Sequence, residues 1–274
     1  KYSLNINFIN EKLSGNLIFF VKKNNFYSYS ILFFGEQNSL LKNHNYFKNS
    51  NKNNSRNYLR TQFSGVGFKN DWVDVKICRG NEDWGAGNNV SLALNHDSDS
   101  YDYFKLNSNY GNIRVNYIYG FLEKTPLNIS RFITAKGIEW TNKRSFNIGL
   151  SETIIYSGPG RGFDLGYLNP ISSHIEVELN DRLTIVGPSN SNALWQIHVD
   201  KIVKNRFRIS LNYLIDEFVI DKDLENNKQS GVAGSFRVSY NIFDSLNYLL
   251  SVNSKFVFVG TNTFRHIMGE NNFV

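Results

Sequence analysis

The sequence has little cysteine, and this scarcity excludes whole classes of protein. Cys78 is the single cysteine of the chain, so an intramolecular disulfide framework cannot form, and neither can a zinc site built from several thiolates. The five histidines are far apart, with no HExxH pattern and no close pair. The acidic run at residues 95–102 lacks the central glycine and terminal glutamate of a calcium loop. We therefore expect no metal and no other cofactor.

Long apolar runs are also missing. No run of about eighteen apolar residues occurs in the chain, which excludes a transmembrane helix. A membrane-spanning β-strand needs only about 9 to 11 residues of alternating character, so a membrane location stays open. Lys1 is followed directly by a strand-like run, and we expect the sequence to be the mature or trimmed form of an exported protein.

Clustered positive charge is absent as well. The net charge is +6, but the lysines and arginines stand singly along the chain. A modest, scattered surplus is typical of a solvated surface, and no RNA-binding signature, zinc-finger spacing or basic helix accompanies it. We expect no nucleic-acid partner.

What the chain has instead is strict alternation of apolar and polar residues. Within residues 206–218, the odd positions from 207 to 215 are apolar and the even positions from 206 to 216 are polar, with Leu214 as the one strong exception. The same pattern fills residues 231–243 and 244–258, with a tight turn between them that predicts a hairpin. Further strands are expected at residues 2–9, 16–21, 26–34, 58–68, 72–79, 101–106, 113–121, 131–140, 146–156 and 193–200, with residues 90–95 as a doubtful addition.

These strands predict an all-β fold, an antiparallel up-and-down transmembrane β-barrel of roughly thirteen or fourteen strands. The strands are about twice the usual length in soluble proteins, and their number exceeds that of a single sandwich. The apolar positions are aliphatic with aromatic residues near the strand ends, as in a lipid-facing band with aromatic girdles. We expect one barrel domain spanning residues 1–274, in the outer membrane of a Gram-negative bacterium.

Two stretches break the alternation. Residues 37–56 are rich in asparagine and low in complexity, which predicts a mobile loop. Residues 157–192 hold three of the four prolines and predict a long structured loop at the barrel mouth, with a short helix around residues 172–180. The last residues, TFRHIMGENNFV, are expected to begin another strand and turn, so that further C-terminal strands would lie beyond this sequence.

Six strings occur in a consistent order along the chain: RGNEDWGAGNNVSLAL, RFITAKGIEW, GLSETIIYSG, DLGYLNPI, NALWQIHVD and LNYLIDEF. Together they resemble the capsule-assembly Wzi family over roughly residues 71–240. The chain departs from the family pattern at Lys136 and Gly137, where the family often has a histidine and a basic residue, and at Ala86, where it often has proline.

The resemblance implies a non-enzymatic outer-membrane barrel that holds capsular polysaccharide or exopolysaccharide at the cell surface. The expected partners are that polysaccharide and outer-membrane lipid, with the protein as a monomer. A sugar site needs aromatic faces together with carboxylate, amide and guanidinium groups. The candidate ligands are Arg79, Asp83, Trp84, Glu152, Arg161, Asp164, Tyr167 and Asn169.

For several of these residues a structural role competes with a binding role. Trp84 opens a Trp-Gly-Ala-Gly turn in which its indole packs locally as readily as it meets a ligand. Glu152 falls at the alternate positions that hold apolar residues in its strand, which would place it on the apolar face. We therefore expect either a bulge that turns it inward or a strand that has already left the membrane. Asp216 and Glu217 point to opposite faces, and we expect them to form a solvated strand end.

Three alternatives remain beside polysaccharide binding. Basic residues on the polar face suggest a passive diffusion pore. A barrel enzyme would use Glu152 or Asp164 as acid or base, but a second convergent catalytic group is not found. A soluble β-sandwich lectin would show the same alternation.

Overall fold

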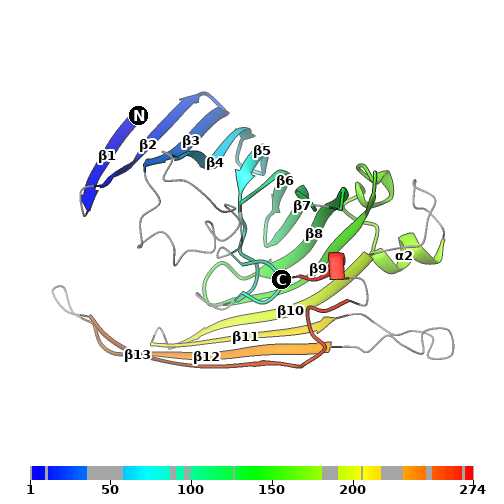
Figure 1. Cartoon of the computed structure of the whole chain (residues 1–274). Helices are drawn as coiled ribbons and strands as arrows, with labels where there is room; N and C mark the ends of the chain where they lie inside the picture. Colours follow the sequence, from blue (N-terminus) through cyan, green and yellow to red (C-terminus); the bar gives the residue numbers. More distant parts are fainter. Residues whose placement is uncertain are drawn as a thin grey trace. The chain divides into compact units, whose positions relative to one another are not determined.

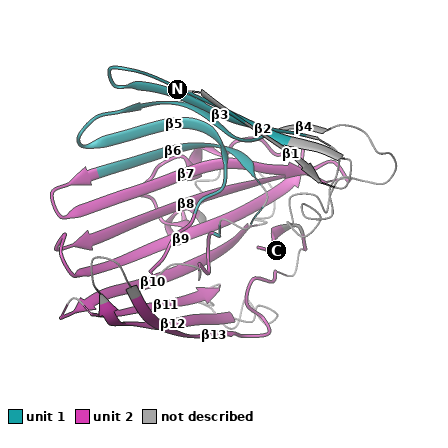
Figure 2. Cartoon of the chain, turned by 90° about the vertical axis from the view of Figure 1, so that its left-hand side faces the viewer, with its two compact units in different colours: residues 1–82, 95–108 teal, residues 83–94, 109–274 magenta. Residues whose placement is uncertain are grey.

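The computed structural model is all-β, with strands that follow one another in chain order (Figure 1). It describes residues 2–9, 12–35, 58–86, 91–95, 98, 100–125, 127–180, 191–204, 206–216, 231–244, 249–266 and 269–273. The predicted loop at residues 37–56, Glu217 and residues 181–190 of the long loop lie outside the described residues. The chain forms two compact units, coloured separately in Figure 2.

The first unit comprises residues 1–82 and 95–108. Its strands pair antiparallel, each with the next along the chain. They are β1 (Tyr2–Ile9), β2 (Lys12–Lys23), β3 (Phe26–Gly35), β4 (Tyr58–Lys69), β5 (Val73–Gly80) and β6 (Tyr101–Tyr110), the last two residues of which belong to the second unit.

The second unit comprises residues 83–94 and 109–274, and its strands also pair antiparallel in chain order. They are β7 (Ile113–Lys124), β8 (Ile129–Thr141), β9 (Phe146–Pro159), β10 (Ser191–Val203), β11 (Phe207–Asp216), β12 (Gly231–Asp244) and β13 (Leu249–Val259). The short helices are η2 (Leu165–Tyr167) and α2 (His174–Leu179) between β9 and β10, and η3 (Gly269–Asn271) after β13.

The predicted all-β, antiparallel up-and-down fold is confirmed, and so is the short helix expected near residues 172–180. Each expected strand is present, and most extend a few residues beyond the alternating core of their pattern. In the doubtful stretch at 90–95, Leu94 forms an isolated bridge with Trp84. No helix in the described part of the chain is long and apolar enough to cross a membrane.

In the second unit, every connection at one end is a short turn, whereas both long connections lie at the other end, beside the short β7–β8 turn. At the short-turn end, Asn142 starts the β8–β9 turn by accepting hydrogen bonds from the backbone N–H groups of Arg144, Ser145 and Phe146. Residues 160–190 and 217–230 connect strands at the opposite end. Outer-membrane barrels have short periplasmic turns and longer extracellular loops, and this unit shows the same asymmetry.

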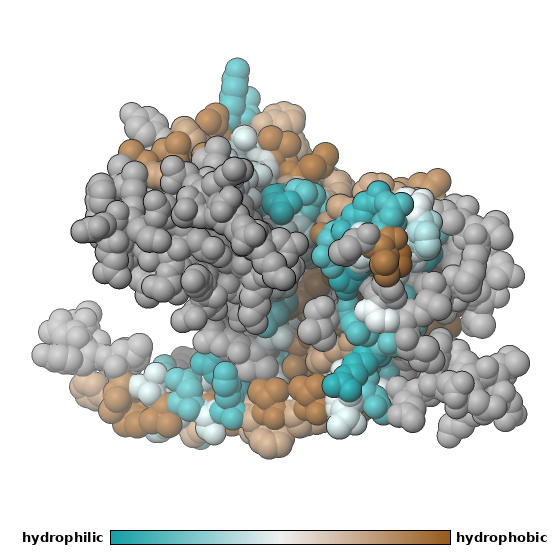
Figure 3. All heavy atoms as spheres, viewed as in Figure 1, coloured by the Kyte–Doolittle hydropathy of each residue, from teal (hydrophilic) through white to brown (hydrophobic). Residues whose placement is uncertain are grey.

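The strands of the second unit present an apolar face and a polar face. Along β11 the exposed and buried positions alternate from end to end, and the exposed ones are Phe207, Ile209, Leu211 and Tyr213. Where β12 and β13 lie, hydrophobic residues gather at the surface in Figure 3. Buried polar residues occupy the opposite face. An exposed aliphatic and aromatic face over a polar interior is the arrangement of lipid-facing strands in outer-membrane barrels.

Candidate functional site

On the apolar face, an oppositely charged pair joins two adjacent strands. Lys136 of β8 and Glu152 of β9 are register partners, and Lys136 Nζ lies 3.1 Å from Glu152 Oε2. The β9 register runs without a shift through Glu152 on both sides, so the expected bulge is absent. Both side chains are almost fully buried. Something must therefore cover this part of the apolar face.

The cover is the segment that follows β9. Glu152 Oε1 accepts a 2.9 Å hydrogen bond from the backbone N–H of His174, and Lys136 Nζ donates to the carbonyl oxygen of Ser172. The hydroxyl of Tyr117 on β7 donates to the carbonyl oxygen of Tyr167 at 3.0 Å. The described part of the loop expected at the mouth thus lies along the apolar face of β7, β8 and β9.

A second group of contacts holds the start of the same segment. Tyr119 of β7 and Tyr156 of β9 share a hydrogen bond, and the backbone N–H of Asp164 donates to the Tyr119 hydroxyl at 2.7 Å. Asp164 caps η2 by accepting from the N–H of Gly166. Arg161 lies over the Tyr156 ring, and its guanidinium carbon is 4.7 Å from the ring centroid. Its Nη2 atom lies 3.6 Å from Asp164 Oδ2.

We call these residues the anchor cluster; its members are Tyr117, Tyr119, Lys136, Glu152, Tyr156, Arg161, Asp164, Tyr167 and His174. Four predicted polysaccharide ligands belong to it, and all four are buried. Their polar groups are used to fix residues 161–177 to the strands. Asn169 lies outside the cluster, exposed, and its side chain accepts from the N–H of Ile171 in a local turn.

On the polar face, the Trp-Gly-Ala turn is fastened to the strands by two side-chain amides. Asn212 of β11 accepts from the N–H of Ala86 and donates to its carbonyl oxygen, both at 2.7 Å. Gln196 of β10 contacts Trp84 O at 3.4 Å and Ala93 N at 3.3 Å. Gly85 has φ +132°, and a β-carbon there would lie 2.6 Å from Asn212 Oδ1. Only glycine satisfies both demands.

The two predicted ligands in this turn differ in exposure. Asp83 is exposed, whereas Trp84 is partly buried, and its indole takes the space beside Gly137, the register partner of Ser151. Gly137 and Ser151 adjoin Lys136 and Glu152 in sequence and therefore face the other way. Trp84 and the anchor cluster thus lie on opposite faces of the same strands.

The C-terminal residues also pack on the polar face. Phe264 and Phe273 contact the core formed by Leu194, Leu214 and Ala233, which explains why Leu214 interrupts the polar row of β11. The backbone N–H of Phe264 donates to Asp216, a residue that is 1% exposed. The prediction of a solvated strand end is therefore wrong for Asp216, because a chain segment covers it.

The expectation of another strand in TFRHIMGENNFV is also wrong for its described residues. They form turns and η3. Asn192 and Arg131 bind backbone carbonyls of Asn271 and Asn272, and the N–H of Phe273 donates to the carbonyl of Phe264. Side chains of the polar face satisfy this backbone, so it needs no strand partner.

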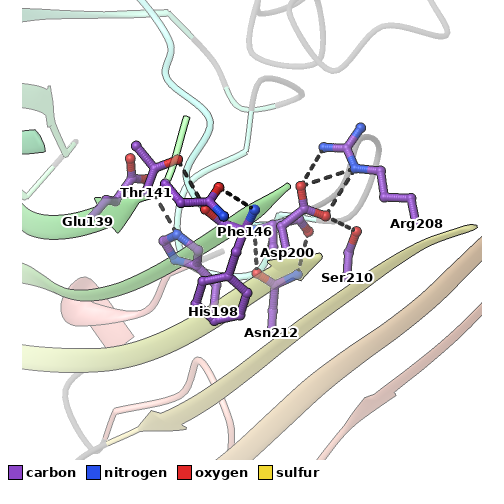
Figure 4. A network of polar contacts seen from close by, with 10 residues as sticks. Glu139, Thr141, Phe146, His198, Asp200, Arg208, Ser210 and Asn212 are labelled. Carbon is purple, nitrogen blue, oxygen red and sulfur yellow. Dashed lines mark hydrogen bonds and ion pairs between the residues drawn. The ribbon is translucent and has the colours of Figure 1, made fainter. Parts of the chain in front are cut away.

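Beyond these two segments, the polar face carries paired charges (Figure 4). Arg208 of β11 binds Asp200 of β10 through its Nε and Nη2 at 2.9 to 3.1 Å, and Ser210 donates to the same carboxylate at 2.7 Å. Glu139 of β8 lies 3.2 Å from Arg114 Nη1 and 3.4 Å from His198 Nε2. The ring of His198 fits because residue 149 is glycine: a β-carbon there would lie 2.3 Å from the imidazole.

In the first unit a separate polar cluster follows β5. Glu82 binds Lys76, Lys105 and the hydroxyl of Tyr103, the last at 2.7 Å. Burial by itself would raise the pKa of Glu82, but the charges of Lys105 and Lys76 outweigh it and hold the pKa below its ordinary value. The predicted ligand Arg79 is partly exposed and pairs with Asp102 at 2.7 Å.

Sequence reasoning missed the role of Lys136, the tyrosines of β7 and the two amides that fasten Trp84, Ala86 and Ala93. One signal was available: Lys136 and Glu152 are opposite charges on the apolar rows of adjacent strands, where a lone charge facing lipid would be costly. Asn212 and Gln196 gave no such signal, since amides are expected on any polar face.

Neither carboxylate considered for acid-base chemistry stands alone. Glu152 is held by Lys136 and His174, and Asp164 by Arg161 and Gly166. In the part of the chain that the structure describes, no group of three or more His, Cys, Asp or Glu side chains comes close enough together to hold a metal ion.

No family model and no curated protein matches the sequence, so the resemblance to the Wzi family stays a prediction. Among solved structures the chain is similar to a porin, with 8% identity and a TM-score of 0.40 over 94% of this chain and 100% of the porin. It is similar to a loop-deletion form of OmpT, an outer membrane protein of Vibrio cholerae, with 8% identity and a TM-score of 0.40 over 91% and 85% of the two chains. A third similar structure is OpdK of Pseudomonas aeruginosa with vanillate, at 11% identity and a TM-score of 0.32 over 93% and 90%.

Proposed function

We propose that this chain is an outer-membrane β-barrel of a Gram-negative bacterium that holds capsular polysaccharide or exopolysaccharide at the cell surface. The observation that carries the proposal is the filled polar face of the second unit. Trp84, Ala86 and Ala93 are fastened there by Asn212 and Gln196, and the C-terminal residues Phe264 and Phe273 cover Leu194 and Leu214. A protein that retains a polymer outside the cell needs no open passage, whereas a diffusion pore does.

The proposed sugar contacts are the two predicted ligands of the Trp-Gly-Ala turn, because Asn169 lies on the opposite face of the strands. Asp83 has an exposed carboxylate, and Trp84, which is partly buried, offers part of an aromatic face. Carboxylates and amides hydrogen-bond sugar hydroxyls, and aromatic rings stack on sugar CH groups. The buried members, such as Glu152 and Asp164, would make no sugar contact, because they fix the loop on the apolar face.

A binding measurement tests the proposal. Purified protein is titrated with capsular polysaccharide and exopolysaccharide, and the Asp83→Ala and Trp84→Ala variants are compared with the native chain. We expect at least a tenfold loss of affinity in both variants. Lys143→Ala serves as the control, because Lys143 is exposed at the short-turn end and should leave binding unchanged. Equal binding by all four proteins, or full polysaccharide retention in cells that lack the gene, would count against the proposal.

A passive diffusion pore is the second candidate, and the paired charges of the polar face favour it. Arg208 with Asp200, and Arg114 with Glu139, line the strands as charged rings line ion-selective passages. Conductance in a planar lipid bilayer separates the two functions. A filled barrel should give little or no current, whereas stable single-channel steps at neutral pH would favour the pore.

A further inference from the structure

The segment that covers the anchor cluster has an unusual surface. Its outward side carries large apolar residues: Phe163 is 61% exposed, Leu165 64%, Leu168 48% and Ile171 90%. They fall within nine consecutive positions of the chain, among which Asn169 is the one exposed side chain with a polar group. An exposed apolar group of this size on a short segment usually marks an interaction surface.

The inward side of the same segment is polar. Arg161, Asp164, Tyr167 and His174 are buried against β7, β8 and β9. The segment is therefore inside-out, with its charged groups beneath and its apolar groups outside. Water would favour the reverse arrangement, because exposed apolar area is costly and solvated charge is not. A segment with its charged groups buried and its apolar groups outward is better suited to apolar surroundings than to water.

The apolar surface of the segment continues an apolar surface of the strands. Ile138 of β8 and Leu150 of β9 are 50% and 47% exposed, and each lies two positions from the covered charge on its strand, Lys136 or Glu152. Since residues two apart in a strand share a face, the exposed row of the strands ends where the segment begins. The apolar row of the strands and the apolar side of the segment therefore face the same apolar surroundings.

The segment is held firmly enough to keep this surface outward. The Phe163 ring packs against those of Tyr119 and Phe132, with centroids 5.0 and 5.2 Å apart. Asp164 is fixed by the Tyr119 hydroxyl and caps η2, which sets Leu165 on the outer side. The apolar surface is thus a built feature of the fold.

We propose that residues 163–171 lie within the membrane interface, where Phe163, Leu165, Leu168 and Ile171 insert between the acyl chains of the outer leaflet. The partner is lipid, met by a loop alongside the strands, and the buried charges beneath fix the depth of the loop. Apolar side chains of interfacial segments bury about 5 to 10 Å into the headgroup and acyl boundary. The inference rests on the proposed membrane location.

Site-directed spin labelling tests it. Because the single cysteine is a buried thiol, Cys78→Ser gives a background in which Leu165→Cys, Leu168→Cys and Ile171→Cys each carry one nitroxide. The labelled proteins are reconstituted in phosphatidylcholine vesicles, and the accessibility of each label to oxygen is compared with that to a water-soluble nickel complex. Leu150→Cys is the lipid control and Arg144→Cys, in the β8–β9 turn, is the water control.

We expect the three loop labels to resemble the Leu150 label, with oxygen accessibility well above nickel accessibility. Loop labels that resemble Arg144 while Leu150 stays in lipid would overturn the inference and leave the membrane location intact. A Leu150 label that resembles Arg144 would overturn the membrane location and the inference with it. Heat-modifiable migration in gels shows that each variant is folded, and three independent positions guard against one that misfolds.

Discussion

Strands β9 and β11 belong to the same unit and carry similar alternating sequences, yet their surroundings differ. Along β11 the exposed and buried positions alternate to the end of the strand, whereas β9 is buried on both faces from Ser151 to Gly158. The difference arises from the segment after β9, which lies on its apolar face. A repeating pattern in the sequence therefore indicates a strand without saying what meets each face.

The two strands also differ in where their charged side chains lie. On β11 the ionised side chains lie on the polar face, where Arg208 meets Asp200. On β9 the carboxylate of Glu152 lies on the apolar face and is tolerated there because Lys136 and the backbone of His174 satisfy it. Covering a strand thus changes which residue types its apolar face can hold.

The largest expected effect comes from breaking the covered pair. Glu152→Leu leaves the ammonium group of Lys136 buried without its carboxylate, and we expect a loss of about 3 to 5 kcal/mol in the free energy of unfolding. Guanidinium unfolding in detergent micelles, followed by tryptophan fluorescence, measures it. The double variant Lys136→Met with Glu152→Leu should recover most of the loss, and a double variant as unstable as the single would contradict this account.

The exposed apolar face of β11, which no segment covers, can be tested by placing a charge on it. Leu211→Arg places a guanidinium in the exposed apolar row, and we expect a cost of about 2 to 4 kcal/mol for folding in a bilayer. Ser251→Arg on the polar face of β13 is the matched control and should cost less than about 1 kcal/mol. Equal costs at the two positions would show that the exposed row does not face lipid.

A smaller effect is expected where the polar face is filled. Asn212→Ala removes two hydrogen bonds to Ala86 and one to Ser235, which should destabilise the turn at residues 84–86 by about 1 to 3 kcal/mol. Faster amide hydrogen exchange at Trp84 and Ala86 would report the change. Asn253→Ala, at an exposed position on the same face, should leave exchange unaltered; unaltered exchange in Asn212→Ala as well would mean that the amide does not fasten the turn.

The smallest expected effect concerns Glu82 of the first unit, whose charge lies outside the strands. Its pKa is lower in the folded protein than in the unfolded chain, where it is about 4.3. The stability it adds is therefore complete above that value and is lost as the pH falls through the folded pKa. Glu82→Gln should remove about 1 kcal/mol at neutral pH and flatten the acid limb of the stability profile. An unchanged acid limb would assign that pH dependence to other groups.

Alternation could be read from the sequence because side chains in a strand point to opposite faces in turn. It located the strands but not their ends, which lie a few residues beyond the pattern in most of them. Leu214 stood out as an exception, but its reason lies some fifty residues away in the chain, in Phe264. The structure brings only some of the predicted ligands together. Glu152, Arg161, Asp164 and Tyr167 do lie close together, but buried, since the same residue types serve sugar binding and internal anchoring equally well.

The sequence by itself determined the strands, their antiparallel order, and which residues share a face, because these follow from local periodicity and short turns. Only the tertiary structure decided what lies on each face: residues 161–177 on the apolar side of β7, β8 and β9, and residues 84–86 and 92–94 on the polar side. The physical reason is that these segments are held by single hydrogen bonds and ion pairs between distant residues, such as Asn212 with Ala86 and Glu152 with His174. Such pairs do not recur at a fixed spacing along the chain, so no repeating pattern in the sequence predicts them.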